Sequence, residues 1–123
     1  MTAPSRPDLA FKIISTQDWT AFETARRYGG STVDRADGYI HMSTTAQLAE
    51  TARKHYAGKL DLMLLSVDLT CLGCALVWEP SRGGDLFPHL YDDLPLSAVT
   101  DARPFTVSDD GFMACEDGAR PWA

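Results

Sequence analysis

The first part of the chain changes from a strand pattern to a helix pattern. Residues 9–15 are rich in branched and aromatic side chains, which is typical of a β-strand. Ser15 or Thr16 can cap a helix that follows this strand. The apolar residues expected on one side of the helix are Ala21, Phe22, Ala25 and Tyr28. Gly29 and Gly30 then predict its end, because glycine readily adopts the left-handed conformation that terminates helices.

A second helix and a buried strand are expected further along the chain. Residues 31–37 are polar and predict a loop. Residues 46–56 then predict a helix, and its apolar face would contain Leu48, Ala49, Ala52 and Tyr56. Residues 61–68 are almost continuously apolar, which indicates a central strand covered on both faces.

The second half of the chain predicts strands and turns without a further helix. Strands are expected at residues 74–79 and 98–107, with a short strand or an extended segment at residues 86–91. This order of elements predicts the α+β class, with a single compact domain and two N-terminal helices. Its core would cover residues 9–107, and residues 108–123 would form a weakly ordered tail or a hairpin.

Composition and charge narrow the classes of protein. The formal net charge of −6 opposes binding to duplex DNA or long RNA, because phosphate contacts there need clustered lysine and arginine. A small anionic ligand in a local positive pocket is still compatible with this charge. No apolar run approaches the roughly 20 residues that span a bilayer, and the N-terminus lacks the apolar core of a signal peptide. We therefore expect a cytoplasmic protein without a membrane partner.

The cysteines and histidines do not predict a disulfide framework or a metal site. Cys71, Cys74 and Cys115 are an odd number in a chain without an export signal. Cys71 and Cys74 lack a second pair that would complete a zinc site, and no two histidines have ligand spacing. We therefore expect no metal cofactor.

His41 is the first candidate for function. It lies in residues 37–44, where a short strand is expected to run into the start of a helix. The hydroxyls of Ser43 and Thr44 and unpaired backbone N–H groups would lie close to it, and such a place favours phosphate or carboxylate. Tyr39 would share a strand face with His41. The alternatives are a core histidine bound to backbone carbonyls or a carboxylate, and simple helix capping by the hydroxyls.

A second histidine, His89, lies in an aromatic segment. Phe87 and Tyr91 are two residues away on either side, so the three side chains would face the same way on a strand. Such a surface could stack on an adenine or nicotinamide ring. The alternative is a packed edge strand with the Tyr91 hydroxyl at its rim.

Two charged residues between His41 and His89, Glu79 and Arg82, are further candidates for function. Glu79 ends an apolar strand, where its carboxylate could bind sugar hydroxyls or stabilise a developing cation. Arg82 precedes two glycines, whose backbone N–H groups can approach an anion together with the guanidinium. The alternatives are an exposed acid paired with Arg82, and an ordinary glycine turn.

Several of these segments together match a known pattern. The matching residues are Trp19, Gly30, Ser31, Asp34, residues 37–44 and 64–68, Trp78, Glu79 and residues 86–91. On them the chain resembles the small bacterial family known as domain of unknown function 952, over roughly residues 10–105. Structures of that family are similar to the ADP-ribosylation fold, so the resemblance implies a split, curved sheet around a cleft.

The resemblance also implies a ligand. In relatives with the ADP-ribosylation fold the cleft holds NAD, which makes NAD the expected cofactor. The strand with His41 and Ser43 is similar to the His-x-Ser strand of RNA 2′-phosphotransferases, which use NAD to remove a splice-junction phosphate. This similarity would place both residues at the cleft wall. The sequence lacks the arginine tetrad of those enzymes and the arginine, Ser-Thr-Ser and glutamate set of the toxin transferases.

Two classes of function follow from these observations. The first is an enzyme or relic enzyme that binds NAD or an ADP-ribose-like nucleotide, with ADP-ribosyl transferase, phosphotransferase-like or hydrolase activity. Its site residues would be His41, His89 and Glu79 as catalytic groups and Ser43, Thr44, Tyr39, Arg82 and Tyr91 as ligand contacts. The second is a non-catalytic module that senses a small molecule or binds a protein. Its histidines would be structural. A separate, purely structural interpretation has His41 and His89 hydrogen-bonding across the core to fix two strands.

Overall fold

The computed structural model describes residues 7–123, except for the side chain of Arg82. Within this part of the chain there are three α-helices: α1 (Thr16–Ala25), α2 (Thr32–Asp37) and α3 (Thr45–His55). The strands there are β1 (Leu9–Ser15), β2 (Arg27–Tyr28), β3 (Ile40–His41), β4 (Leu62–Asp68), β5 (Leu76–Pro80), β6 (Leu86–Leu90), β7 (Leu94–Pro95), β8 (Val99–Val107) and β9 (Met113–Cys115). This mixture of helices and antiparallel strands confirms the α+β class. No helix in the described residues is long and apolar enough to cross a membrane.

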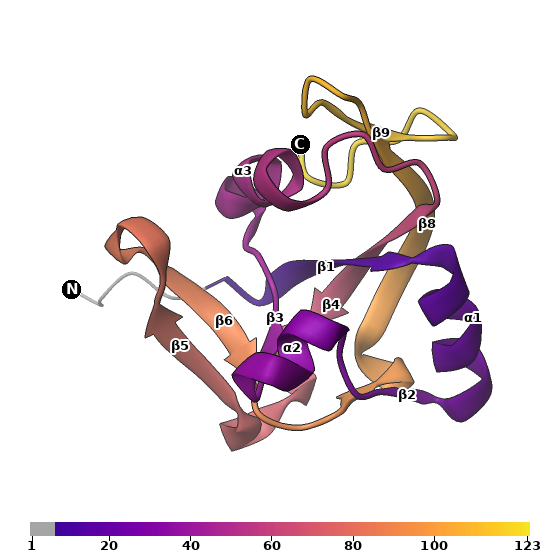
Figure 1. The fold of residues 1–123 in the computed structure, drawn as a ribbon. Coiled ribbons are helices and arrows are strands. Elements are labelled where there is room, and N and C mark those ends of the chain that lie inside the picture. The colour runs from indigo at the N-terminus through magenta and orange to yellow at the C-terminus, as the bar shows by residue number, and fades with distance from the viewer. Residues whose placement is uncertain (1–6) are drawn as a thin grey trace.

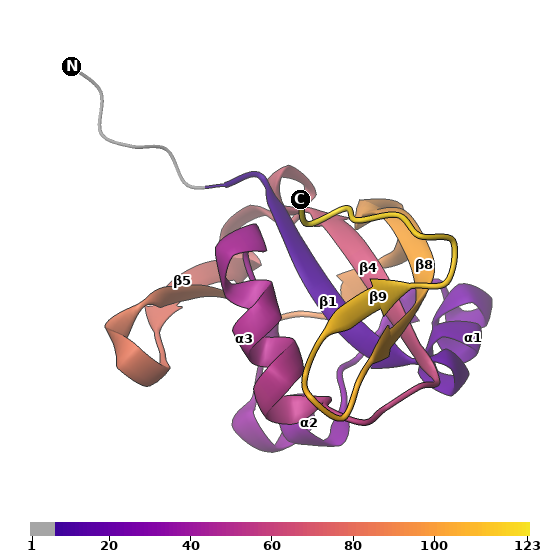
Figure 2. The ribbon, with the colours of Figure 1, turned by 90° about the horizontal axis from the view of Figure 1, so that it is seen from above.

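The strands are divided among separate antiparallel sheets. One sheet has four strands in the order β1-β4-β8-β9, and another has three in the order β3-β6-β5. β2 and β7 pair with each other. A single bridge between Phe11 of β1 and Ser43 connects the two larger sheets. Figures 1 and 2 show β5 extending away from the four-stranded sheet, on the side opposite α1.

β4 is flanked by β1 and β8 and is buried on both faces. Leu65 and Val67 face a core that includes Phe22 of α1. Leu64 points the other way, into a second core that includes Leu48 of α3, because successive strand side chains point to opposite faces. α3 packs against β1 over this second core (Figure 2). The prediction of a central strand covered on both faces is therefore confirmed.

The first helix is shorter than its apolar pattern predicts. α1 ends at Ala25, because Arg26 adopts the left-handed conformation with φ 65°. Tyr28 then lies in β2, where it is paired with Leu94 of β7. Its ring stacks on Phe22 of α1 at a centroid distance of 5.6 Å. Tyr28 therefore still packs against Phe22, but it does so from β2 and not from the helix. The prediction that Tyr28 belongs to the helix and that glycine ends it is wrong.

The loop predicted for residues 31–37 is also wrong, because α2 forms there. Ser31 and Asp34 make a capping box: Ser31 Oγ accepts from the Asp34 amide, and Asp34 Oδ2 accepts from the Ser31 amide. Gly38 ends the helix with φ 88°. The described chain therefore has three helices in its first half instead of the two that were expected. Two residues of this added helix are important for the site.

The strands predicted for the second half are present, with changes at their ends. β5 begins at Leu76 instead of residue 74, because Gly73–Ala75 form a turn of 3-10 helix. β6 pairs with β5 along its length and with β3 at its end. β9 pairs with the last residues of β8, so the chain from β8 to β9 is a hairpin.

Candidate functional site

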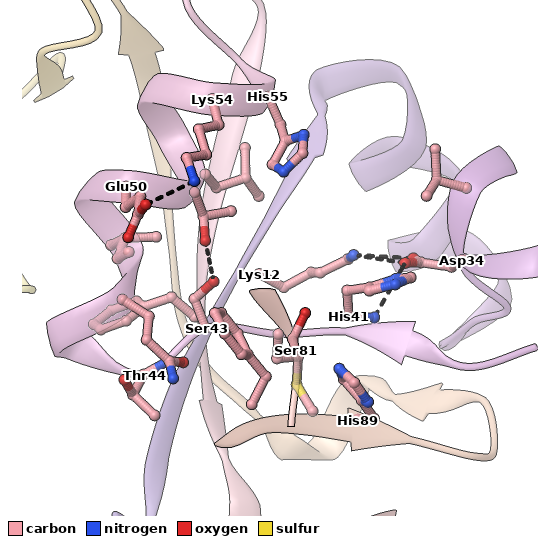
Figure 3. Close-up of a pocket in the computed structure, with 18 of the residues that line it drawn as sticks. Lys12, Asp34, His41, Ser43, Thr44, Glu50, Lys54, His55, Ser81 and His89 are labelled. Atoms are coloured by element: carbon pink, nitrogen blue, oxygen red, sulfur yellow. Dashed lines mark hydrogen bonds and ion pairs between the residues drawn. The ribbon is translucent and has the colours of Figure 1, made fainter. Parts of the chain in front are cut away.

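A cavity of about 1130 Å³ lies beside the two larger sheets, and we call it the cleft. Side chains reach it from β1, α2, β3, α3 and the β5–β6 hairpin (Figure 3). Its polar lining includes Lys12, Asp34, Asp37, His41, Ser43, Thr44, His55 and His89. Segments that are far apart in the sequence therefore contribute to one polar surface.

His41 and His89 lie directly opposite each other in the ladder between β3 and β6. Residues paired in this way point to the same face of a sheet. Their ring centroids are 5.5 Å apart, with the rings inclined at 68°. Both side chains line the cleft. The fold therefore brings the two histidines into one site without a hydrogen bond between their rings in the described structure.

The ring of His41 lies between two carboxylates of α2. Its Nδ1 is 2.6 Å from Asp34 Oδ1, and its Nε2 is 2.9 Å from Asp37 Oδ2. The first contact is a hydrogen bond in which Nδ1 donates to a carboxylate that can only accept. The second is an ion-pair contact that is charged only if the ring is protonated. The side chain is 34% exposed, which leaves the ring accessible from the cleft.

Asp34 and Lys12 form a buried ion pair behind His41, with 2.9 Å between Lys12 Nζ and Asp34 Oδ2. Their side chains are 3% and 5% exposed, respectively. Burial alone would raise the pKa of Asp34, but the hydrogen bond from His41, the charge of Lys12 and two backbone amides hold it well below its usual range. Burial lowers the pKa of Lys12, and Asp34 offsets this only in part. Asp34 is therefore a fixed negative charge that orients the His41 ring.

His89 has a different set of partners. Its Nδ1 is 2.9 Å from Glu79 Oε1, and the Tyr91 hydroxyl donates to the same oxygen at 2.7 Å. The hydrogen bonds from Tyr91 and His89 lower the pKa of Glu79, and the bond to Glu79 raises the pKa of Tyr91 to about 12. The ring of Tyr39 stacks on His89 at 4.1 Å and 8°. The His89 side chain is only 4% exposed.

The comparison with known families covers this arrangement except for Lys12, which lies one residue before the matched segment. The model of the family described as "Protein of unknown function (DUF952)" matches residues 13–102. The chain belongs to the DUF952 family. The matched segment contains both histidines and their carboxylate partners, and it confirms the family that the sequence motifs resemble.

Solved structures similar to this DUF952 chain include those of protein CC0527 from Caulobacter crescentus. The crystal structure of CC0527 has 45% sequence identity to this chain and a TM-score of 0.81. The match covers 85% of this chain and 92% of CC0527. Its solution NMR structure is also 45% identical, with 85% and 90% coverage and a TM-score of 0.75. No curated protein matches the chain. The similarity thus extends over nearly the whole of CC0527.

Three of the predicted ligand contacts in the DUF952 segment, Tyr39, Ser43 and Thr44, line the cleft. Ser43 Oγ is 2.9 Å from Thr51 Oγ1 of α3. The Thr44 amide donates to Gln47 Oε1 at 3.0 Å, in the capping box that begins α3. The polar groups of this strand-to-helix junction therefore also hold α3 in place.

The other predicted residues lie further from the cavity. Glu79 and Tyr91 are not among the described residues that line the cleft, and Glu79 is connected to it through His89. The side chain of Arg82 lies outside the described part of the chain. Glu79 therefore contacts the ring of His89, and that ring lines the cleft.

Sequence reasoning missed Lys12 and Asp37 as site residues and gave Asp34 no role there. Lys12 had a detectable signal, because it is a charged residue in the middle of an otherwise apolar strand. Asp34 had one too, because it stands three residues after Ser31 in a capping-box pattern. His55, in the last turn of α3, also lines the cleft.

The lining combines charged and aromatic side chains. Lys12 and Lys54 provide positive charge, and Tyr39, Trp78 and Phe87 provide aromatic surface. Five carboxylates also line the cleft, those of Asp18, Asp34, Asp37, Glu50 and Asp85. In the described residues, no group of three or more histidine, cysteine, aspartate or glutamate side chains is placed to hold a metal ion.

Proposed function

We propose that the cleft binds a nucleotide of the NAD or ADP-ribose type. The observation that carries the proposal is the pair of imidazoles, His41 and His89, at 5.5 Å in one cleft. Each ring contacts a carboxylate through Nδ1, which fixes its orientation. Oriented imidazoles of this kind can donate to phosphate and ribose oxygens and can act as general acids or bases.

The size and lining of the cleft support this proposal. A volume of about 1130 Å³ is slightly above the roughly 300–1,000 Å³ that is typical of small-molecule sites. Trp78 and Phe87 line it from the β5–β6 hairpin, whereas Lys12 and Asp34 come from β1 and α2. A nucleotide could place its flat ring against the aromatic residues of the hairpin and its ribose and phosphate groups near the charged residues of β1 and α2.

The position of the cleft supports an ADP-ribosylation type of fold as the finer part of the proposal. The two larger sheets are joined at the bridge between Phe11 and Ser43, and both residues line the cleft. A cavity at the place where a sheet is split agrees with what the family resemblance implies.

The two histidines have different roles in this proposal. The imidazolium of His41 binds phosphate or ribose oxygens. Hydrolysis of NAD would break the bond between ribose C1′ and nicotinamide, join C1′ to the oxygen of water, and release one proton from that water. His89 would accept this proton on Nε2, because its Nδ1 is bound to Glu79, and the Glu79 charge would stabilise the resulting imidazolium.

Titration calorimetry with ADP-ribose and NAD tests the binding. In His41→Gln we expect affinity to fall at least about tenfold, or about 1.4 kcal/mol, with little change in melting temperature. Asp101→Asn is a matched control, because it removes the carboxylate of a surface pair with Arg103 outside the cleft lining. It should bind as wild type does. Failure of the wild type to bind either nucleotide at millimolar concentration would refute the proposal.

A non-catalytic module with structural histidines is the second candidate, and the burial of His89 under Tyr39 favours it. This alternative predicts that the wild type binds nucleotide without turnover. Nicotinamide release from NAD separates the two candidates. Release by the wild type that is lost in His89→Gln supports the enzyme.

A further inference from the structure

The two carboxylates that contact His41 differ in how firmly they are held. Asp34 is 3% exposed and also accepts hydrogen bonds from Lys12 and from two backbone amides. Asp37 is 48% exposed. Within the described residues, its carboxylate makes one hydrogen bond or ion pair, the 2.9 Å contact with Nε2 of His41. One side of the ring is therefore fixed, and the other side can exchange its partner.

The position of Asp37 indicates that α2 does not need this carboxylate. Asp37 is the last residue of α2 and is followed by the C-cap Gly38. A negative charge at the C-terminal end of a helix is not favoured by the helix dipole. Ion pairs between exposed groups are weak, because water competes for both partners. Asp37 can therefore leave His41 with little loss of stability.

We propose that the Asp37 carboxylate occupies the place of an anionic oxygen of the ligand, from a phosphate or carboxylate group, on Nε2 of His41. The proposal rests on the nucleotide-binding function proposed for the cleft. On binding, the ligand oxygen replaces Asp37 while Asp34 stays on Nδ1. No covalent bond changes, since one N–H donor exchanges one oxygen acceptor for another. Asp37 thereby lowers the affinity for anions and selects ligands whose acidic group reaches His41.

The charges around the ring support an anion at this position. With the His41 ring protonated, Lys12 and His41 carry two positive charges and the buried Asp34 carries one negative charge. When Asp37 turns away, this group keeps one net positive charge next to the cleft. Tyr39 and His89, the other polar rings packed against His41, add no formal charge in their neutral forms.

Calorimetric titration of wild type and Asp37→Asn with inorganic phosphate, ADP-ribose and acetate tests the inference. The asparagine keeps the shape of the side chain and removes its charge. Because the displaced contact is an exposed one, we expect binding of the preferred anion to tighten about three- to tenfold. Inorganic phosphate and ADP-ribose carry phosphate groups, whereas acetate carries a carboxylate. The affinities for these probes therefore show which of the two acidic groups binds at His41. The melting temperature should stay that of the wild type, since Asp37 is half exposed.

Asp85→Asn is the matched control, because it removes another carboxylate from the cleft lining, near the β5–β6 hairpin. Screening at physiological salt should limit its effect to less than about twofold. The gain in Asp37→Asn should also disappear when it is combined with His41→Gln.

The possible results separate the inference from the proposed function. A gain in Asp37→Asn that exceeds the gain in Asp85→Asn supports the inference. Equal gains in both variants overturn it, because the general charge of the cleft would then explain them. Unchanged or weaker binding in Asp37→Asn, beside measurable binding in the wild type, overturns it and leaves the proposed function standing. Absence of binding to every probe in both proteins refutes the proposed function as well.

Discussion

His41 and His89 occupy facing positions on β3 and β6, and the elements around them give the two rings different surroundings. His41 is 34% exposed, and both of its nitrogens contact carboxylates of α2. His89 is 4% exposed, contacts Glu79 of β5, and lies flat against the ring of Tyr39. The difference shows that a ladder position alone does not set the role of a histidine. We propose that His41 exchanges partners with a ligand, whereas His89 is held in the wall of the cleft.

Removing the buried carboxylate of Asp34 should have the largest effect on the difference between the two histidines. In Asp34→Asn, Lys12 would keep a buried charge without its partner, so we expect the free energy of unfolding to fall by about 3–5 kcal/mol. Urea unfolding measures this change. Glu79→Gln is the corresponding variant on the His89 side, and it should lose clearly less because Glu79 is 34% exposed. Equal losses of unfolding free energy in the two variants would show that the carboxylate partners of the two histidines are equally important for stability.

The same carboxylate predicts a dependence of stability on acid. The pKa of Asp34 is held below its usual range, so the unfolded chain takes up a proton at a pH where the folded chain does not. Its stabilising effect is present above the ordinary carboxyl pKa of about 4 and is lost as the pH falls further. We expect the difference in unfolding free energy between wild type and Asp34→Asn to narrow below about pH 4. A difference that does not depend on pH would exclude this explanation.

Replacing each histidine by glutamine separates its effect on stability from its effect on ligand affinity. We expect His89→Gln to lower the free energy of unfolding by about 1–3 kcal/mol, because its ring is buried and Glu79 loses a donor. His41→Gln should cost less stability and more affinity for ADP-ribose. Urea unfolding and calorimetry on the same samples measure both quantities. The opposite order, with His41 as the more stabilising residue, would reverse the roles assigned here.

The parts of the fold that the sequence predicts well are those with local signals. The apolar run of β4 and the Thr44 capping box of α3 are each contained within a few residues. The end of α1 was misplaced because Tyr28 pairs with Leu94, a distant partner that no local pattern shows. α2 was missed because it has only six residues and few apolar ones, so its capping box was the one available signal.

The same distinction applies to the site. Both histidines could be singled out from the chemistry of their own segments, and their facing positions follow from the pairing of β3 with β6. The contact between Lys12 and Asp34 joins residues 22 positions apart, and neither segment alone reveals it. The link from Glu79 to His89 likewise depends on the β5–β6 register. Local sequence therefore identifies the two histidines, and long-range pairing decides which side chains each of them contacts.

Nitrogen-15 NMR of the histidine rings during titration with ADP-ribose shows whether the ligand reaches Nε2 of His41. The ligand should contact Nε2 of His41 while Nδ1 stays on Asp34, so the Nε2 resonance should move with ligand concentration and the Nδ1 resonance should move much less. The nitrogens of His89 should show smaller changes than Nε2 of His41. Binding of ADP-ribose that leaves both His41 nitrogens unchanged would contradict the account.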